Sequence, residues 1–236
     1  MDSLDMLAAF GLTHQEAKLY TALHGHRAAT GYELARLAGI SRSNAYASLS
    51  SLEAKGATHA IDGKPQRYQA VPVAEFCANH IRSLGEMRTV LERELVLVDE
   101  EESPYLTIRG GGNIANKIKT IIESTLRRIY LAMPSHLLRA FVPLLEELAG
   151  RGCKVVAVTD SGIKIAGATV HRARQLSESV RVIADSSMTL AGELDGSDTC
   201  TCLYSMKKNL VDLIRDSIRN EIRLIELTPG QGKENL

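Results

Sequence analysis

Residues 39–56, GISRSNAYASLSSLEAKG, decide how the first part of the chain folds. Gly39 can end one helix, and Ser41 can begin the next by accepting a hydrogen bond from a backbone N–H of its first turn. The apolar positions Ala45, Leu49 and Leu52 recur at helical spacing. They predict a helix with one inward face that ends at Gly56. Such a helix is either an ordinary surface helix or one that enters a groove of DNA.

The same capping pattern predicts two helices before this stretch. Thr13-His-Gln-Glu16 and Thr30-Gly-Tyr-Glu33 both place a Thr three residues before a Glu. In such a capping box each side chain satisfies an unpaired backbone N–H at the start of the helix. The small Ala35 and the flexible Gly39 allow the second and third helices to meet across a tight turn.

A hairpin is predicted directly after the third helix, with strands at about Thr58–Ile61 and Arg67–Val71. The residues between them, DGKPQ, have strong turn chemistry. The order helix, helix, turn, helix, hairpin is that of a winged helix-turn-helix, whose last helix enters the major groove of DNA. We therefore expect a DNA-binding domain at residues 1–72.

The outward side of the third helix and the hairpin predict the contacts with double-stranded DNA. Arg42 can pair bidentately with guanine, whereas Ser41 and Ser43 at the helix start suit phosphate. The remaining expected contacts are Asn44, Tyr46, Ala47, Ser50, Lys64 and Arg67. Residues 39–72 contain four basic and two acidic side chains. Because this surplus is small, we expect that firm binding needs two copies of the domain.

Residues 73–103 predict a helical linker that ends at about Glu102. Its apolar residues approach a heptad spacing: Leu84, Met87, Leu91, Leu95 and Val98. This pattern favours a coiled coil in a homodimer, and a two-fold protein matches a palindromic operator. A helix packed on its own domain is the alternative.

Residues 104–236 alternate strand and helix patterns, which predicts an α/β domain and makes the whole chain a multidomain α+β protein. Strands are expected at 105–109, 127–133, 153–159, 168–171, 181–185, 188–192 and 200–204, and a closing strand at 221–227. Helices are expected at 113–126, 136–150 and 209–220. The apolar segment 153–159 is expected to be central in the sheet.

The composition excludes several classes of protein. With 44% apolar and 24% charged residues, the chain can bury a globular core, and its formal net charge of zero requires any nucleic-acid surface to be local. We expect a cytoplasmic protein without a membrane partner, because no apolar run is long enough to span a bilayer and the N-terminus lacks a signal-peptide pattern. Cys200 and Cys202 share a strand face but have no second ligand pair nearby, so we expect buried thiols, no metal site and no cofactor.

The N-terminal motifs resemble the TrmB-like family of transcriptional regulators, which are mostly archaeal and often sugar-responsive. The resemblance is carried by LTHQEAKLYTAL (12–23), GISRSNAYASLSSLEAKG (39–56) and GKPQRYQAVP (63–72). It implies a C-terminal domain similar to the phospholipase D fold that senses a small molecule. Active phospholipase D enzymes carry His-x-Lys-x4-Asp. When that Asp is aligned with Asp185, Glu178 and Val180 stand in place of the His and the Lys, so we expect a non-catalytic relative with no catalytic residues.

The expected effector site uses residues at strand ends and in loops, where such folds hold ligands. The candidates are Arg109, Gly110, Asn113, His136, Asp160 and Asp185. The leading hypothesis is a homodimeric DNA-binding regulator whose C-terminal domain senses a sugar-like metabolite. The alternatives are a hydrolase or transferase with a DNA-targeting domain, and an architectural DNA-binding protein without a ligand.

Overall fold

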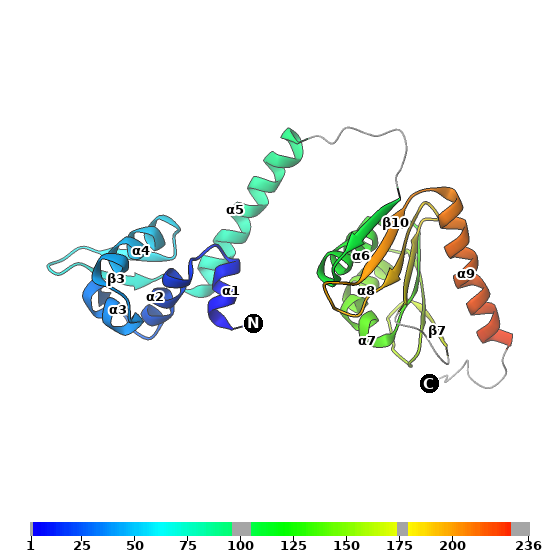
Figure 1. Cartoon of the computed structure of the whole chain (residues 1–236), viewed down its shortest axis with the longest axis horizontal. Coiled ribbons are helices and arrows are strands. Elements are labelled where there is room, and N and C mark those ends of the chain that lie inside the picture. The colour runs from blue at the N-terminus through cyan, green and yellow to red at the C-terminus, as the bar shows by residue number, and fades with distance from the viewer. Residues whose placement is uncertain (1, 96–104, 174–178, 228–236) are drawn as a thin grey trace. The chain divides into compact units, whose positions relative to one another are not determined.

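The computed structural model describes residues 2–95, 105–173 and 179–227. The chain forms two compact units, Met1–Val98 and Asp99–Leu236 (Figure 1). No helix of the described residues is long and apolar enough to cross a membrane.

The N-terminal unit is a winged helix-turn-helix followed by a long helix. Its elements are α1 (Ser3–Ala9), α2 (His14–His24), β1 (Ala29–Thr30), α3 (Gly31–Ala38), α4 (Arg42–Ala54), β2 (Thr58–Ile61), β3 (Arg67–Ala70) and α5 (Val73–Glu94). The strands form an antiparallel sheet in the order β1-β3-β2. The predicted helices and hairpin are confirmed, whereas α1 and β1 were not predicted.

Local capping explains where these helices begin and end. Both predicted capping boxes are formed, because Thr13 and Thr30 accept from the N–H groups of Glu16 and Glu33, whose carboxylates accept in return. Gly39 ends α3 in the left-handed region, with φ of 65°, a conformation that costs a glycine little. The polypeptide can therefore turn sharply from α3 into α4.

The core of this unit lies between α2, α3, α4 and the hairpin. Its fully buried side chains include Leu19, Leu23, Leu34, Ala45, Leu49 and Leu52. Tyr20 on α2 is also buried, and its hydroxyl donates to the carbonyl oxygen of Val71 at 2.8 Å. This bond joins the helical core to the end of the hairpin.

A partly buried ion pair closes the side of the unit near α1. Glu16 Oε2 lies 2.7 Å from Lys55 Nζ, and only 4% of the Glu16 side chain is exposed. Lys55 Nζ also donates to the carbonyl oxygen of Gly11 at 2.8 Å. Burial alone raises the pKa of Glu16, but hydrogen bonds from Lys55, Ser51 and the N–H of Thr13 outweigh it and leave the pKa below its ordinary value.

Helix α5 ends earlier than predicted. It stops at Glu94 rather than at about Glu102, because Leu95 adopts non-helical torsion angles (φ −103°, ψ 67°). Four of the predicted seam residues are about half exposed or more: Leu84 (50%), Met87 (56%), Leu91 (51%) and Leu95 (69%). The fifth, Val98, and the predicted helix end at residues 99–102 lie outside the described residues. The described part of the seam does not pack on its own unit.

The C-terminal unit is built on a seven-stranded mixed sheet in the order β4-β10-β9-β8-β5-β6-β7. The strands are β4 (Leu106–Arg109), β5 (Arg128–Ala132), β6 (Lys154–Thr159), β7 (Thr169–Arg172), β8 (Ser179–Ala184), β9 (Met188–Glu193) and β10 (Thr201–Ser205). Strands β5, β6 and β7 are parallel, and all other neighbours are antiparallel.

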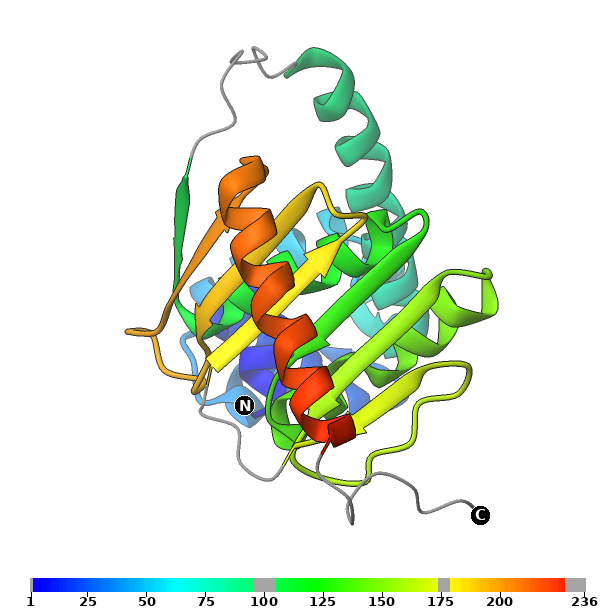
Figure 2. The same ribbon diagram turned by 90° about the vertical axis from the view of Figure 1, so that its right-hand side faces the viewer.

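Helices cover both faces of this sheet. Helix α6 (Gly111–Ser124), α7 (Ser135–Leu138), the 3-10 turn η1 (Arg139–Phe141) and α8 (Val142–Gly150) share one apolar cluster with the sheet. Helix α9 (Lys208–Leu227) packs on the other face and crosses several strands diagonally (Figure 2). The predicted α/β layering is therefore present.

Three predicted elements of this unit are wrong in detail. The segment 221–227 is the end of α9 rather than a strand, because Ile218, Ile222 and Ile225 continue one apolar stripe against the sheet. The helix predicted at 136–150 is interrupted by η1, and Pro143, which has no backbone N–H to donate, lies in the first turn of α8. Strand β6 is next to the edge strand rather than central, although it is paired on both sides.

Replacing Glu16 by Gln should lower the free energy of unfolding of the N-terminal unit at neutral pH by about 1–3 kcal/mol, because Lys55 loses a buried charged partner. The folded-state pKa of Glu16 is depressed, so the stabilisation is present above the unfolded-state pKa and is lost as the pH falls through the folded-state value. Urea titrations at neutral and acid pH measure both effects. Glu92→Gln, at an exposed ion pair on α5, is the control and should change little. Equal losses in the two variants would contradict the role given to Glu16.

Candidate nucleic-acid interface

The start of α4 is open to solvent. Ser41, Arg42, Ser43 and Asn44 are all exposed. The hydroxyl of Ser41 caps α4 by accepting from the N–H of Asn44 at 3.3 Å and lies 3.2 Å from the hydroxyl of Ser43. The two serines therefore form one polar group at the positive end of the helix, where phosphate oxygens are favoured.

Arg42 is placed by an aromatic ring that the sequence analysis missed. Its guanidinium carbon lies 4.2 Å from the ring centroid of Tyr32 on α3, and this tyrosine is 49% exposed. A cation held over an aromatic face is attracted by the ring and loses less freedom on binding. The only signal for Tyr32 was its place in the first turn of the preceding helix, two residues after the Thr30 cap.

Tyr46 is fixed by a close contact between α3 and α4. A Cβ atom at Gly31 would lie 2.5 Å from Cε1 of the Tyr46 ring, a distance that forces the ring to move. The ring therefore lies on the glycine backbone, while 47% of the residue remains exposed. Gly31 is a second residue that the sequence analysis missed, because its role depends on a neighbour fifteen positions away.

The two basic residues of the hairpin occupy different positions. Lys64 lies in the turn between β2 and β3, whereas Arg67 begins β3 and is paired in register with Thr30 of β1. The Thr30 hydrogen bonds are the main cause of a lowered pKa at Glu33, and the positive charge of Arg67 adds to it. Arg67 thus balances an acidic side chain at the strand pair next to the turn, while Lys64 lies within the turn itself.

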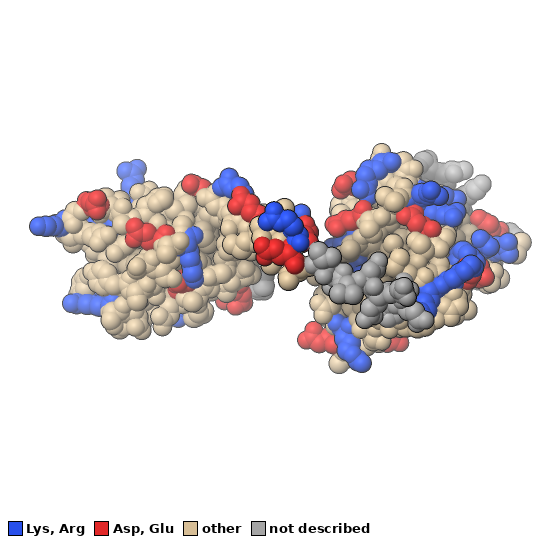
Figure 3. All heavy atoms as spheres, turned by 90° about the horizontal axis from the view of Figure 1, so that it is seen from above, with Lys and Arg blue, Asp and Glu red and all other residues tan. Residues whose placement is uncertain are grey.

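All nine predicted DNA contacts are at least partly open to solvent in the structure. They are Ser41, Arg42, Ser43, Asn44, Tyr46, Ala47, Ser50, Lys64 and Arg67. On the face drawn in Figure 3, basic side chains of this unit stand apart from one another and acidic ones lie between them. The charge on that face is therefore mixed, and the small charge surplus of residues 39–72 predicts a contact surface that is only weakly basic.

The six predicted effector residues do not form one site. Arg109, Gly110 and Asn113 cluster at the end of β4, where the Asn113 amide donates to the Arg109 carbonyl oxygen at 3.0 Å. Asp160 follows β6, several strands away from β4, next to α7, which carries His136. The Asp160 carboxylate accepts from the N–H of Ser135 at 2.8 Å, and this bond is the main cause of the lowered pKa of Asp160.

Asp185 lies at the opposite end of strand β5 from Asp160 and has a structural role. Its two carboxylate oxygens accept from the N–H groups of Leu126, Arg127 and Arg128 at 2.8–2.9 Å. Burial raises its pKa, but these three bonds outweigh burial and leave it lowered. Of the two residues aligned with the phospholipase D motif, Val180 is fully buried and Glu178 lies outside the described residues.

The thiols of Cys202, on β10, and of Cys200, just before β10, are buried. Cys202 is 1% exposed, and burial raises its pKa to about 11, so its thiol stays protonated and unreactive at neutral pH. No group of three or more His, Cys, Asp or Glu side chains within 2–95, 105–173 and 179–227 is arranged to hold a metal ion.

Comparison with known proteins places both units in one family. Residues 7–74 match the family described as "Sugar-specific transcriptional regulator TrmB", and residues 105–219 match the N-terminal subdomain of the effector-binding domain (EBD) of TrmB regulators. The chain is 25% identical over 235 residues to the uncharacterized protein YrhO of Bacillus subtilis (strain 168), an alignment that covers 95% of this chain and 86% of that protein.

Two solved structures show distant likeness. TrmBL2, an archaeal chromatin protein, is 19% identical with a TM-score of 0.44, and the match covers 92% of this chain and 96% of that one. NucT from Helicobacter pylori is 12% identical with a TM-score of 0.45 over 52% of this chain and 97% of its own.

Gly31→Ala should lower the free energy of unfolding of the N-terminal unit by about 1–3 kcal/mol, because the new methyl group collides with the Tyr46 ring. In the double variant Gly31→Ala/Tyr46→Ala the collision is absent. Tyr46→Ala should therefore lower the free energy of unfolding less in the Gly31→Ala background than in the parent. A double-mutant cycle by urea titration measures this coupling. Strictly additive losses would show that the ring does not depend on Gly31.

Proposed function

Because the chain belongs to the TrmB-like family of DNA-binding transcriptional regulators, we propose that it reads a specific operator with the start of α4 and the tip of the β2–β3 hairpin. The observation that carries this proposal is the exposed helix start with Arg42 held over Tyr32. Arg42 pairs with a guanine edge in the major groove. Ser41, Ser43 and Lys64 contact the phosphate backbone, and Asn44, Tyr46, Ala47, Ser50 and Arg67 complete the contact surface.

The operator is bound by two copies of the chain. One N-terminal unit offers few uncompensated basic side chains, and each neutralised phosphate adds a limited amount of affinity. Helix α5 supplies a surface for pairing, because Leu84, Met87 and Leu91 form an exposed apolar stripe with near-heptad spacing, and the exposed Leu95 follows directly after the helix. A homodimer formed through α5 matches an operator whose half-sites are palindromic.

The C-terminal unit controls DNA binding by taking up a small metabolite. Its match to an effector-binding domain supports this role, and the family description favours a sugar-like ligand. Val180 is buried, and the carboxylate of Asp185 already accepts hydrogen bonds from three backbone N–H groups. Both observations favour a sensor over a phospholipase D-like hydrolase. The ligand acts on DNA affinity only if it prefers one arrangement of the two recognition helices. Such a regulator works in the cytoplasm, alongside the DNA.

Arg42→Ala should weaken binding to an operator selected from a random DNA pool by about 1–3 kcal/mol and relax the base preference at one position of each half-site. Lys64→Ala should weaken binding to all sequences alike and reduce the salt slope by about one for each phosphate that Lys64 no longer neutralises. Fluorescence anisotropy over a series of salt concentrations separates the two effects. Arg139→Ala, in the C-terminal unit, removes the same charge elsewhere and is the control. Parent-like operator affinity and preference in Arg42→Ala would refute its proposed role.

Leu91→Glu should convert the dimer into a monomer and reduce operator affinity, because it places a charge in the apolar stripe of α5. Sedimentation equilibrium measures the first effect and anisotropy the second. Thr89→Glu adds the same charge at an exposed position on another side of the helix and should leave the dimer intact. A dimer that survives Leu91→Glu would exclude α5 as the seam.

A further inference from the structure

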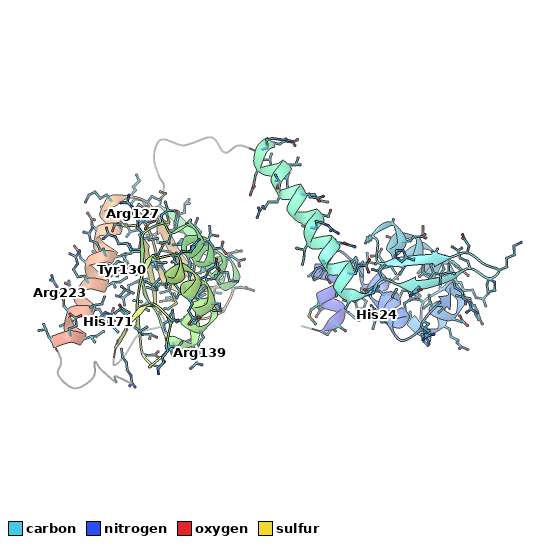
Figure 4. All side chains as sticks on the ribbon, turned by 180° about the vertical axis from the view of Figure 1, so that it is seen from behind. His24, Arg127, Tyr130, Arg139, His171 and Arg223 are labelled. Atoms are coloured by element: carbon cyan, nitrogen blue, oxygen red, sulfur yellow. The ribbon has the colours of Figure 1, made fainter. Side chains whose placement is uncertain are left out.

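A pocket outside the predicted effector site lies between α9 and the sheet. Its volume is about 440 Å³, which is within the range of small-molecule sites. Tyr130 of β5 and Ile183 of β8 line it from the sheet, and Ile218 and Ile222 line it from α9. Figure 4 marks Tyr130 on the sheet and Arg223 on α9. The lining therefore offers apolar surface on both sides and an aromatic ring on the sheet side.

Four arginines line the same pocket and give it a positive charge. Arg128 comes from the start of β5, and Arg215, Arg219 and Arg223 follow one another on α9 at intervals of four residues. Among the described residues of the lining, Glu226 is the one that is acidic. Lys154, the register partner of Arg128 on β6, adds a further cation, since its Nζ lies 5.9 Å from the Tyr130 ring centroid.

These arginines are only partly neutralised by the protein. Arg215 NH1 lies 2.7 Å from Asp212 Oδ1, and Arg219 NH1 lies 3.9 Å from Asp216 Oδ1. Arg128 and Arg223 have no ion pair with a residue in the described part of the chain. Like charges converging on one pocket repel each other, and a bound anion relieves that repulsion.

The backbone that carries Arg128 is held in place at this end of the strand. Asp185 Oδ1 accepts from the N–H groups of Arg127 and Arg128 at 2.9 Å each. The next residue, Ser186, lines the pocket itself. Asp185, predicted as a ligand contact, is therefore a positioning residue that fixes one of the cations.

We propose that this pocket binds a small organic molecule carrying a phosphate group. The guanidinium groups hold the phosphate, because their paired N–H groups match its oxygens, and the Tyr130 side contacts the organic part. A concave pocket that combines apolar and cationic side chains suits a small ligand better than a DNA backbone, which requires an extended basic surface. Only the regulatory meaning of this binding rests on the proposed function.

The test is isothermal titration calorimetry of the full chain with glucose 6-phosphate and AMP, and with their phosphate-free forms glucose and adenosine. At least one phosphorylated probe should bind, and its phosphate-free form should bind about tenfold more weakly or not at all. Inorganic phosphate should bind more weakly than that probe, since it lacks the organic part. Failure of both phosphorylated probes, or equal affinity for inorganic phosphate, would overturn the proposal.

Matched variants locate the binding. Arg219→Gln/Arg223→Gln changes two exposed side chains and should weaken binding of the phosphorylated probe by about tenfold or more, whereas Glu226→Gln should strengthen it. Arg139→Gln, on the side of the sheet that carries α7 and α8, is the control and should leave the affinity unchanged (Figure 4). Parent-like affinity of the double variant for the phosphorylated probe would overturn the proposed site. Weaker binding of the probe by Glu226→Gln would overturn it as well.

Two further measurements separate this proposal from its rivals. A short random DNA duplex should bind the parent and the Arg219→Gln/Arg223→Gln variant equally. The opposite result would be that the variant binds the duplex more weakly and that the parent binds neither glucose 6-phosphate nor AMP. The arginines would then be DNA contacts, and the proposal would be refuted. Arg42→Ala should keep parent-like affinity for the phosphorylated probe, so a failure of the DNA-binding proposal leaves the pocket test intact.

Discussion

The ion pair between Glu16 and Lys55 is the interaction on which the presentation of α4 depends. It joins the turn before α2 to the end of α4, because Lys55 also bonds to the carbonyl oxygen of Gly11, and Glu16 also accepts from the N–H of Thr13. The end of α4 is thus anchored to the core, and Ala45, Leu49 and Leu52 anchor its inward face. With both fixed, the start of α4 stays exposed and keeps one orientation toward a partner.

The N-terminal elements were readable in the sequence because their determinants are local. Thr30 and Glu33, or Ser41 and Asn44, interact within one helical turn, and the hairpin follows from its own turn residues. The contacts between Arg42 and Tyr32 and between Tyr46 and Gly31 were not readable in this way. They join different helices, and their existence depends on how closely α3 and α4 approach.

The C-terminal unit shows where such local reasoning stops. The segment 221–227 alternates apolar and polar residues well enough for a strand, yet its isoleucines also continue the stripe of α9, and contact with the sheet decides in favour of the helix. Because the predicted helix ended at residue 220, Arg223 was assigned to a different element from Arg215 and Arg219. The row of arginines that lines the pocket was therefore not predicted from the sequence. Strand order, which scatters the six effector candidates over the sheet, depends on long-range pairing.

The contact between Gly31 and Tyr46 links two positions of the chain. No side chain fits at residue 31 while the Tyr46 ring rests on its backbone. Alanine at position 31 therefore displaces the Tyr46 ring, unless a smaller residue at position 46 leaves room for the new methyl group. A change at either position therefore alters which residues the other can accept without a shift of this outward face of α4.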